Sequence, residues 1–156
     1  MSGRLLALVR PGQERVALAA LPALVATARA ERASIRIACL RPLPPPREDR
    51  HGRVISDTDR EMARLTSATE ATFAAAARVF EDVTIECVVR FGRPTREARL
   101  EIEAFAPDVV ASFEGRGALG AIRYLITGAR RSAASASAAS RATRSAAFWR
   151  RAMRTP

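Results

Sequence analysis

Short apolar runs bounded by turn residues recur along the chain and predict buried β-strands. The first run covers residues 5–9 and ends at a Pro-Gly pair. A continuous apolar run of this length is typical of a strand covered on both faces, as in parallel sheets. Residues 34–40 and 83–90 alternate apolar with polar positions, and residues 109–112 form another short apolar run. We therefore expect four strands.

Apolar residues at spacings of three and four predict a helix from Glu14 to about Arg32, between the first two strands. Pro22 lies inside this helix, where it removes one backbone hydrogen bond and costs about 3 kcal/mol or bends the helix. The expected buried stripe consists of Leu18, Leu21, Val25 and Ala28.

A long second helix is expected after a proline-rich loop at residues 41–55. Two overlapping capping signatures precede it, Ser56-x-x-Asp59 and Thr58-x-x-Glu61. We interpret the acidic side chains of this segment as charges that favour the helix N-terminus, not as paired catalytic carboxylates. The apolar stripe of this helix runs through Met62, Leu65, Thr69, Phe73, Ala76 and Phe80.

Two further helices complete the pattern. One follows a Gly-x-Pro turn and carries Leu100, Ile102 and Phe105. The other is a short apolar helix at residues 122–126, after a glycine-rich turn at residues 115–120.

The order of these elements predicts an α/β domain with a doubly wound parallel sheet in three layers. Strands separated by helices pair in parallel through right-handed crossovers, which places helices on both faces. Four strands are recognisable, and a fifth is not evident. Ligands of such sheets bind beyond the carboxyl ends of the strands. Those ends correspond to residues 10–13, 40–42, 90–94 and 112–120.

The apolar pattern stops near residue 129. Ala, Arg, Ser and Thr account for 24 of the last 28 residues, and this segment holds seven arginines and no acidic residue. The remaining 128 residues are nearly balanced, with 19 arginines against 16 acidic residues. We therefore expect a domain at residues 1–129 and a basic tail at residues 130–156.

Composition narrows the class of protein. No apolar run approaches the roughly 20 residues that a membrane span needs, and the N-terminal run is too short for a secretory signal, so a cytoplasmic location is expected. The only histidine, His51, and the two cysteines lie far apart in the sequence, so no metal site is expected. We interpret Cys39 and Cys87 as core residues, because both fall on the apolar phase of their strands.

Gly115-x-Gly117-x-x-Gly120 matches the dinucleotide fingerprint in form, but it follows the fourth strand and the fingerprint follows the first. Contact with another phosphate or nucleotide, and a merely permissive loop, stay open. The tail is open in the same way. With Phe148 and Trp149 it could grip nucleic acid, lie on an acidic lipid surface, or remain a solvated appendage. A further hypothesis is that the tail is translated from a reading frame other than that of the domain.

Up to about residue 129 the chain resembles the universal stress protein family. The resemblance is carried by the order of elements, by VVRFGRP at residues 88–94, and by APDVVASFEGRGAL at residues 106–119. The first passage is similar to the family's strand, Gly-x-Pro, helix connection. The second is similar to its Asp-led fourth strand entering a Gly-x-x-Gly phosphate loop. The resemblance implies a sheet of the adenine nucleotide alpha hydrolase-like class.

The same resemblance implies a nucleotide site, although several residues of this chain differ from those of the family's site. Arg10 stands where ATP-binding members carry an Asp, and Leu40 matches the position that contacts adenine. Ser112 and Gly115 match the two loop glycines. After the loop the family carries a Gly-Ser or Gly-Thr pair. The nearest candidate here is Gly128-Ala129, which comes three residues late and lacks the hydroxyl.

These departures predict a non-catalytic cytoplasmic stress-response or regulatory module that does not depend on ATP, with no cofactor, no catalytic residue and no metal. The first alternative is an ATP-binding member, slow hydrolysis included, that uses Gly115, Gly117 and Gly128 beside Arg10, Leu40 and Ser112. The second is an interaction protein whose arginine-rich tail binds nucleic acid or acidic lipid. The resemblance also implies a homodimer, but the final strand through which the family forms it is not recognisable here.

Overall fold

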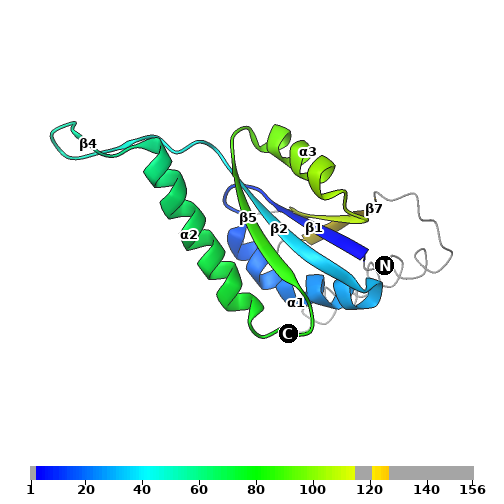
Figure 1. The fold of residues 1–156 in the computed structure, drawn as a ribbon. Helices are drawn as coiled ribbons and strands as arrows, with labels where there is room; N and C mark the ends of the chain where they lie inside the picture. The colour runs from blue at the N-terminus through cyan, green and yellow to red at the C-terminus, as the bar shows by residue number, and fades with distance from the viewer. Residues whose placement is uncertain (1–2, 115–120, 127–156) are drawn as a thin grey trace, which may run out of the picture.

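The computed structural model describes residues 3–114 and 121–126 (Figure 1). The expected domain boundary at residue 129, the tail, Gly115, Gly117 and Gly128 lie outside the described residues. None of the described helices has the length and apolar content that crossing a bilayer requires.

A five-stranded sheet forms the centre of the described domain, with the strand order β5-β2-β1-β6-β7. Neighbours pair in parallel from β5 to β6, whereas β7 runs antiparallel to β6. The sheet is therefore mixed, and the prediction of an all-parallel sheet holds for four of its strands. The strand bounds are β1 Gly3–Val9, β2 Ala33–Arg41, β5 Ile85–Phe91, β6 Val109–Glu114 and β7 Ala121–Ile126.

The predicted short helix at residues 122–126 is wrong, because these residues form β7. This strand is also the fifth strand of the sheet, which the sequence pattern did not reveal, and it lies beside β6. Ile122 and Tyr124 pack against the core, while Arg123 between them pairs with Glu114 at 2.6 Å. That alternation has the period of a strand. In the sequence this alternation is not visible, because four of the five residues 122–126 are apolar.

Helices cover the sheet on both faces, so the three-layer α/β architecture is confirmed (Figure 1). Helices α1 (Glu14–Glu31) and α2 (Thr58–Ala77) pack on one face over the larger core, which includes Leu5, Ile37 and Phe73. Helix α3 (Pro94–Phe105) packs on the opposite face over a smaller cluster around Leu6, Ala38 and Val110.

Helix α1 agrees with its prediction. Leu21, Val25 and Ala28 of the predicted stripe are buried, and Pro22 lies inside the helix. The helix ends at Glu31, and the capping residue Arg32 has a left-handed backbone (φ 50°) and donates its N–H to carbonyls of the last turn.

The start of α2 differs in detail from both predicted capping boxes. Asp57 is the N-cap residue, and its carboxylate accepts a hydrogen bond from the Arg60 N–H at 2.9 Å. Glu61 is buried and pairs with Arg64 at 3.0 Å. Hydrogen bonds from Ser56 and then Arg64 lower the pKa of Glu61. The interpretation of these carboxylates as helix N-terminal charges is confirmed.

The predicted proline-rich loop contains a small two-stranded ribbon that projects from the body of the domain (Figure 1). It is formed by β3 (Arg47–Glu48) and β4 (Val54–Ser56), which run antiparallel. The Asp49 carboxylate organises the turn between them, because it accepts hydrogen bonds from the N–H groups of His51 and Arg53. These contacts, the one to Arg53 first, lower the pKa of Asp49. His51 is exposed at this turn.

Candidate functional site

The carboxyl ends of the four parallel strands lie along one edge of the sheet, where doubly wound folds bind ligands. Strand β1 lies between β2 and β6. The connection from β1 to β2 passes through α1 on one face, and the connection that leads into β6 passes through α3 on the other. The topological switch point is therefore between β1 and β6.

The chain spans this switch point with one of its own side chains. Gln13 lies just before α1, its Nε2 donates to the Phe113 carbonyl at 2.9 Å, and its Oε1 accepts from the Arg10 N–H at 3.2 Å. Gly12 enables the preceding turn with a φ of 82°. Polar backbone groups at the ends of both strands are thus already paired. Sequence reasoning placed Gln13 at this edge but assigned it no role.

The structure places three of the predicted site residues near this edge. Arg10 is exposed in the loop after β1, Leu40 is buried near the end of β2, and Ser112 is half-buried on β6. Ser112 pairs with Leu8, so β1 separates it from Leu40. Within the described part of the chain, no hydrogen bond or ion pair joins these three side chains.

Arg41 is a residue of this edge that sequence reasoning did not single out. Its Nη2 pairs with the Glu14 carboxylate at 3.1 Å and donates to the Thr69 hydroxyl at 3.3 Å, so it ties β2 to both α1 and α2. Its Nε is buried and has no hydrogen-bond partner among the described residues. Because Glu14 lies in the first turn of α1, a phosphate at that helix start would meet a carboxylate.

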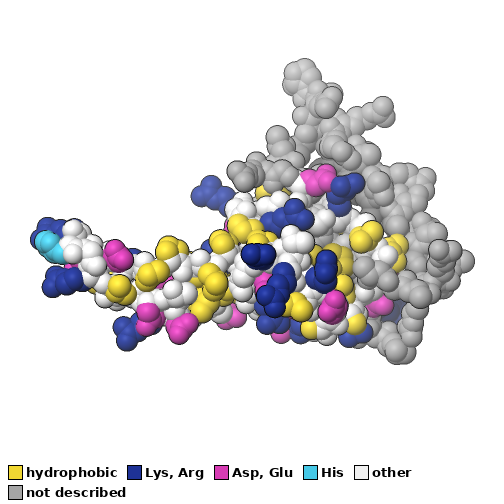
Figure 2. All heavy atoms as spheres, turned by 90° about the horizontal axis from the view of Figure 1, so that it is seen from above, with side chains coloured by type: hydrophobic (Ala, Val, Ile, Leu, Met, Phe, Trp, Pro, Cys, Tyr) yellow, Lys and Arg dark blue, Asp and Glu magenta, His cyan; other side chains and the backbone are white. Residues whose placement is uncertain are grey.

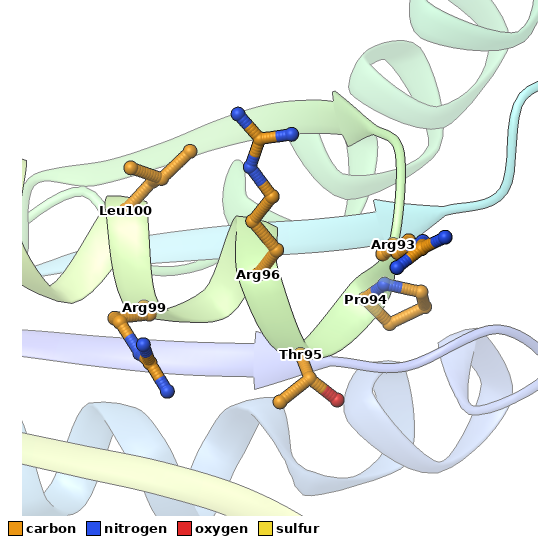
Figure 3. A pocket seen from close by; sticks show the side chains of 6 residues that line it. All are labelled: Arg93, Pro94, Thr95, Arg96, Arg99 and Leu100. Atoms are coloured by element: carbon orange, nitrogen blue, oxygen red, sulfur yellow. The ribbon is translucent and has the colours of Figure 1, made fainter.

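Three arginines gather on the outer side of α3, around a shallow hollow of about 480 Å³. Arginine side chains are conspicuous on this side of the molecule when it is viewed from above (Figure 2). Figure 3 shows Arg96 and Arg99 leaving the helix in different directions, with Arg93 and Pro94 at its start. No acidic partner of the three is found among the described residues. The hollow is lined by Arg93, Pro94, Thr95, Arg96, Arg99 and Leu100.

The opposite side of α3 carries a buried ionic cluster. Glu101 is 1% exposed, and its two oxygens accept from Arg36 at 3.0 Å and from Arg90 at 2.7 Å. The Arg36 guanidinium also lies over the Phe105 ring, 4.3 Å from its centroid. Burial lowers the pKa of Arg36, but hydrogen bonds to Glu101 and Glu86 outweigh it and raise the pKa overall. Leu100, which we expected on the helix's apolar stripe, is instead exposed.

The predicted core positions of the cysteines are confirmed for Cys39, which is buried, and only in part for Cys87, which is half-buried. No group of three or more potential metal ligands occurs in the described parts of the chain.

No protein-family model, curated protein or solved structure matches the chain. The resemblance to universal stress proteins therefore stays a prediction from the sequence motifs.

Proposed function

We propose that this chain is a universal stress protein-like regulatory module that performs no catalysis and does not depend on ATP. The observation that carries the proposal is the Gln13 bridge across the β1–β6 switch point. A ligand in that crevice would have to displace both hydrogen bonds of a side chain that belongs to the domain itself. The bond from Gln13 to the Phe113 carbonyl is half-buried, and a polar group there is costly to leave unpaired, so the bridge favours a closed crevice.

Two charges at the same edge support this proposal. Arg10, at the position of the family's ligand-facing Asp, is exposed after β1 and cannot accept hydrogen bonds from a nucleotide. Glu14 already occupies the first turn of α1 and is paired with Arg41. The positive end of that helix is thus compensated by the chain's own carboxylate.

Thermal unfolding with and without Mg²⁺-ATP tests the proposal. A ligand present at a hundred times its Kd adds about 2.7 kcal/mol of stability, which raises Tm by several degrees. We expect no such rise with millimolar Mg²⁺-ATP. Inorganic tripolyphosphate is the matched control, because an arginine-rich chain binds polyanions without recognising adenine. A saturable rise with ATP that tripolyphosphate does not reproduce would overturn the proposal.

A second candidate function is recognition of an acidic protein partner through the outer face of α3. The specific observation is the clustering of Arg93, Arg96 and Arg99 around one hollow, with Leu100 46% exposed among them. Arginines around an apolar residue are typical of protein interfaces. The lining residues include no aromatic side chain on which a nucleic-acid base could stack.

A glutamate-rich, leucine-containing peptide serves as the probe for this second candidate. We expect the triple variant Arg93→Gln, Arg96→Gln, Arg99→Gln to weaken salt-sensitive binding of the peptide in fluorescence anisotropy by at least about tenfold, because three charged contacts are lost. The matched control replaces three exposed arginines elsewhere: Arg15→Gln, Arg60→Gln, Arg78→Gln. Equal weakening in both triple variants would show that binding follows net charge alone.

A further inference from the structure

Strand β5 forms an open end of the sheet. Within the described residues its only strand partner is β2, and the two strands pair in a regular register along the seven residues of β5. None of these seven side chains is buried, although five are apolar, whereas the neighbouring β2 buries five of its nine. Proline and bulges, two devices that keep a sheet edge from pairing, are missing from this strand. The outer edge of β5 is therefore available to another strand.

Backbone hydrogen bonds define which groups of β5 point outward. Ile35 donates its N–H to the Thr84 carbonyl at 2.9 Å, and Gly92 donates its N–H to the Arg41 carbonyl at 2.9 Å. Successive residues of a strand direct their N–H and C=O groups to opposite sides, so the even-numbered residues of β5 bond to β2. The odd-numbered residues of β5 direct theirs to the outer edge.

The charges of β5 are self-complementary. Its sequence IECVVRF places Glu86 and Arg90 symmetrically about Val88. When two β5 strands pair antiparallel with Val88 at the centre, each Glu86 is opposite the Arg90 of the second copy. The outward-pointing residues form the hydrogen-bonded pairs of this register, so Glu86 and Arg90 form a non-hydrogen-bonded pair, in which the side chains are closer. A shift of the register in either direction removes both ion pairs.

Both charged side chains have exposed surface for a further partner. Glu86 accepts from Arg36 through its Oε2, and its side chain is 52% exposed. Arg90 donates to Glu101 through its Nε, and its side chain is 46% exposed. A pair between Glu86 and the Arg90 of the second copy would therefore extend the ionic cluster under α3 without breaking either bond.

On the opposite face of the sheet, α2 runs alongside β5 and leaves room for the second copy (Figure 1). A hollow of about 310 Å³ between them is lined by residues that include Ala74 and Ala77 of α2 and Ile85 of β5. In the antiparallel register, Phe91 of the second copy is opposite Ile85, so its ring would cover this hollow. Apart from Glu70, the exposed residues of α2 between positions 66 and 77 are alanine, serine and threonine. Such small side chains permit close approach.

We propose that β5 is a dimerisation edge and that its partner is a second copy of this chain. The two β5 strands pair antiparallel about a two-fold axis at Val88, and the two sheets join into one. The interface is isologous, so each copy contributes the same residues. The strand at the other end of the sheet, β7, lacks this complementarity, because its one charged residue, Arg123, pairs with Glu114 of its own chain.

A disulfide at the two-fold axis tests the register. Residue 88 is opposite itself there, and the Cα atoms of a non-hydrogen-bonded pair are about 4.5 Å apart. That distance lies within the range of about 4.4–6.8 Å that a disulfide requires. We expect the full chain with Val88→Cys and Cys87→Ser to form a covalent dimer on mild oxidation, with the disulfide mapped to position 88 by mass spectrometry. Glu103→Cys with Cys87→Ser, exposed on α3, is the control for collisional cross-linking.

Sedimentation equilibrium tests the charge complementarity. We expect a reversible dimer for the unmodified chain, and we expect Glu86→Arg to raise its Kd by at least about tenfold, because like charges then face each other on both sides of the axis. Glu103→Arg makes the same change of charge on the exposed side of α3 and should leave the Kd unchanged. Circular dichroism confirms that each variant is folded.

Hydrogen exchange distinguishes this edge from any other. Dilution of the dimer should speed exchange of the outward N–H groups of Cys87 and Val89, but not of Glu86 and Val88, which bond to β2. A chain that stays monomeric at every concentration would overturn the proposal. So would a dimer that persists in Glu86→Arg, does not cross-link at position 88, and protects β7 instead of β5.

Discussion

Replacing Glu101 with alanine lowers the free energy of unfolding by about 3 kcal/mol, one of the two largest effects that we expect from a single substitution in this domain. The carboxylate is 1% exposed and pairs with Arg36 and Arg90 from two neighbouring strands. Its removal leaves the Arg36 guanidinium, whose side chain is only 24% exposed, with Glu86 as its remaining ionic partner. Breaking a buried pair costs about 3–5 kcal/mol, and we expect the lower end because both arginines reach solvent.

Urea unfolding monitored by circular dichroism measures this loss. Glu103→Ala is the matched control, because Glu103 is exposed on the same helix and its replacement should change stability by less than about 0.5 kcal/mol. Glu101→Gln keeps the acceptor oxygen and loses the charge, so its effect should lie between the two. A loss below about 1 kcal/mol for Glu101→Ala would contradict a structural role of the ionic cluster.

Replacing Phe73 with alanine destabilises the domain by about 3–5 kcal/mol and loosens α2 in particular. Phe73 is the only apolar side chain that α2 buries fully, and it packs in the larger core under α1 and α2. Deleting the ring removes both its burial energy and its contacts with the core residues around it. Hydrogen exchange should show lost protection along α2 while β1 and β2 stay protected.

The control for Phe73 lies just beyond the same helix. Val79 is 78% exposed, and Val79→Ala should change stability by no more than about 0.5 kcal/mol. If Phe73→Ala lowered stability without any preferential loss of protection in α2, the view that this one ring anchors the helix would be wrong.

Local periodicity was sufficient to predict the elements whose pattern of buried positions repeats regularly along the chain. The run at residues 5–9 is buried on both faces, and such a strand needs no partner to be recognised, because every position is apolar. The stripe of α1 repeats at helical spacing, and its Leu21, Val25 and Ala28 are buried. These patterns depend only on the local geometry of a strand or a helix, so the sequence is enough to recognise them.

Contacts between distant segments decided the rest. Residues 122–126 read as helix or strand with equal ease, and only pairing with β6 makes them β7, since the hydrogen-bonding partner lies outside the segment. Glu101 looks like one of several surface carboxylates of α3 until β2 and β5 bring Arg36 and Arg90 against it.

The candidate sites followed the same division. The order of strands and helices identified the carboxyl edge as the place for a ligand, because that edge is a property of topology. Whether the edge is open depends on Gln13, whose partner Phe113 is 100 residues away in the sequence. The placement of Cys39 and Cys87 on the same side of neighbouring strands likewise arises only from the register of β2 against β5. Sequence alone therefore determined the layers, the buried face of α1 and the edge. The Gln13 bridge and the pairing of the buried charges were decided by the tertiary structure, because both depend on side chains that the fold brings together from distant segments.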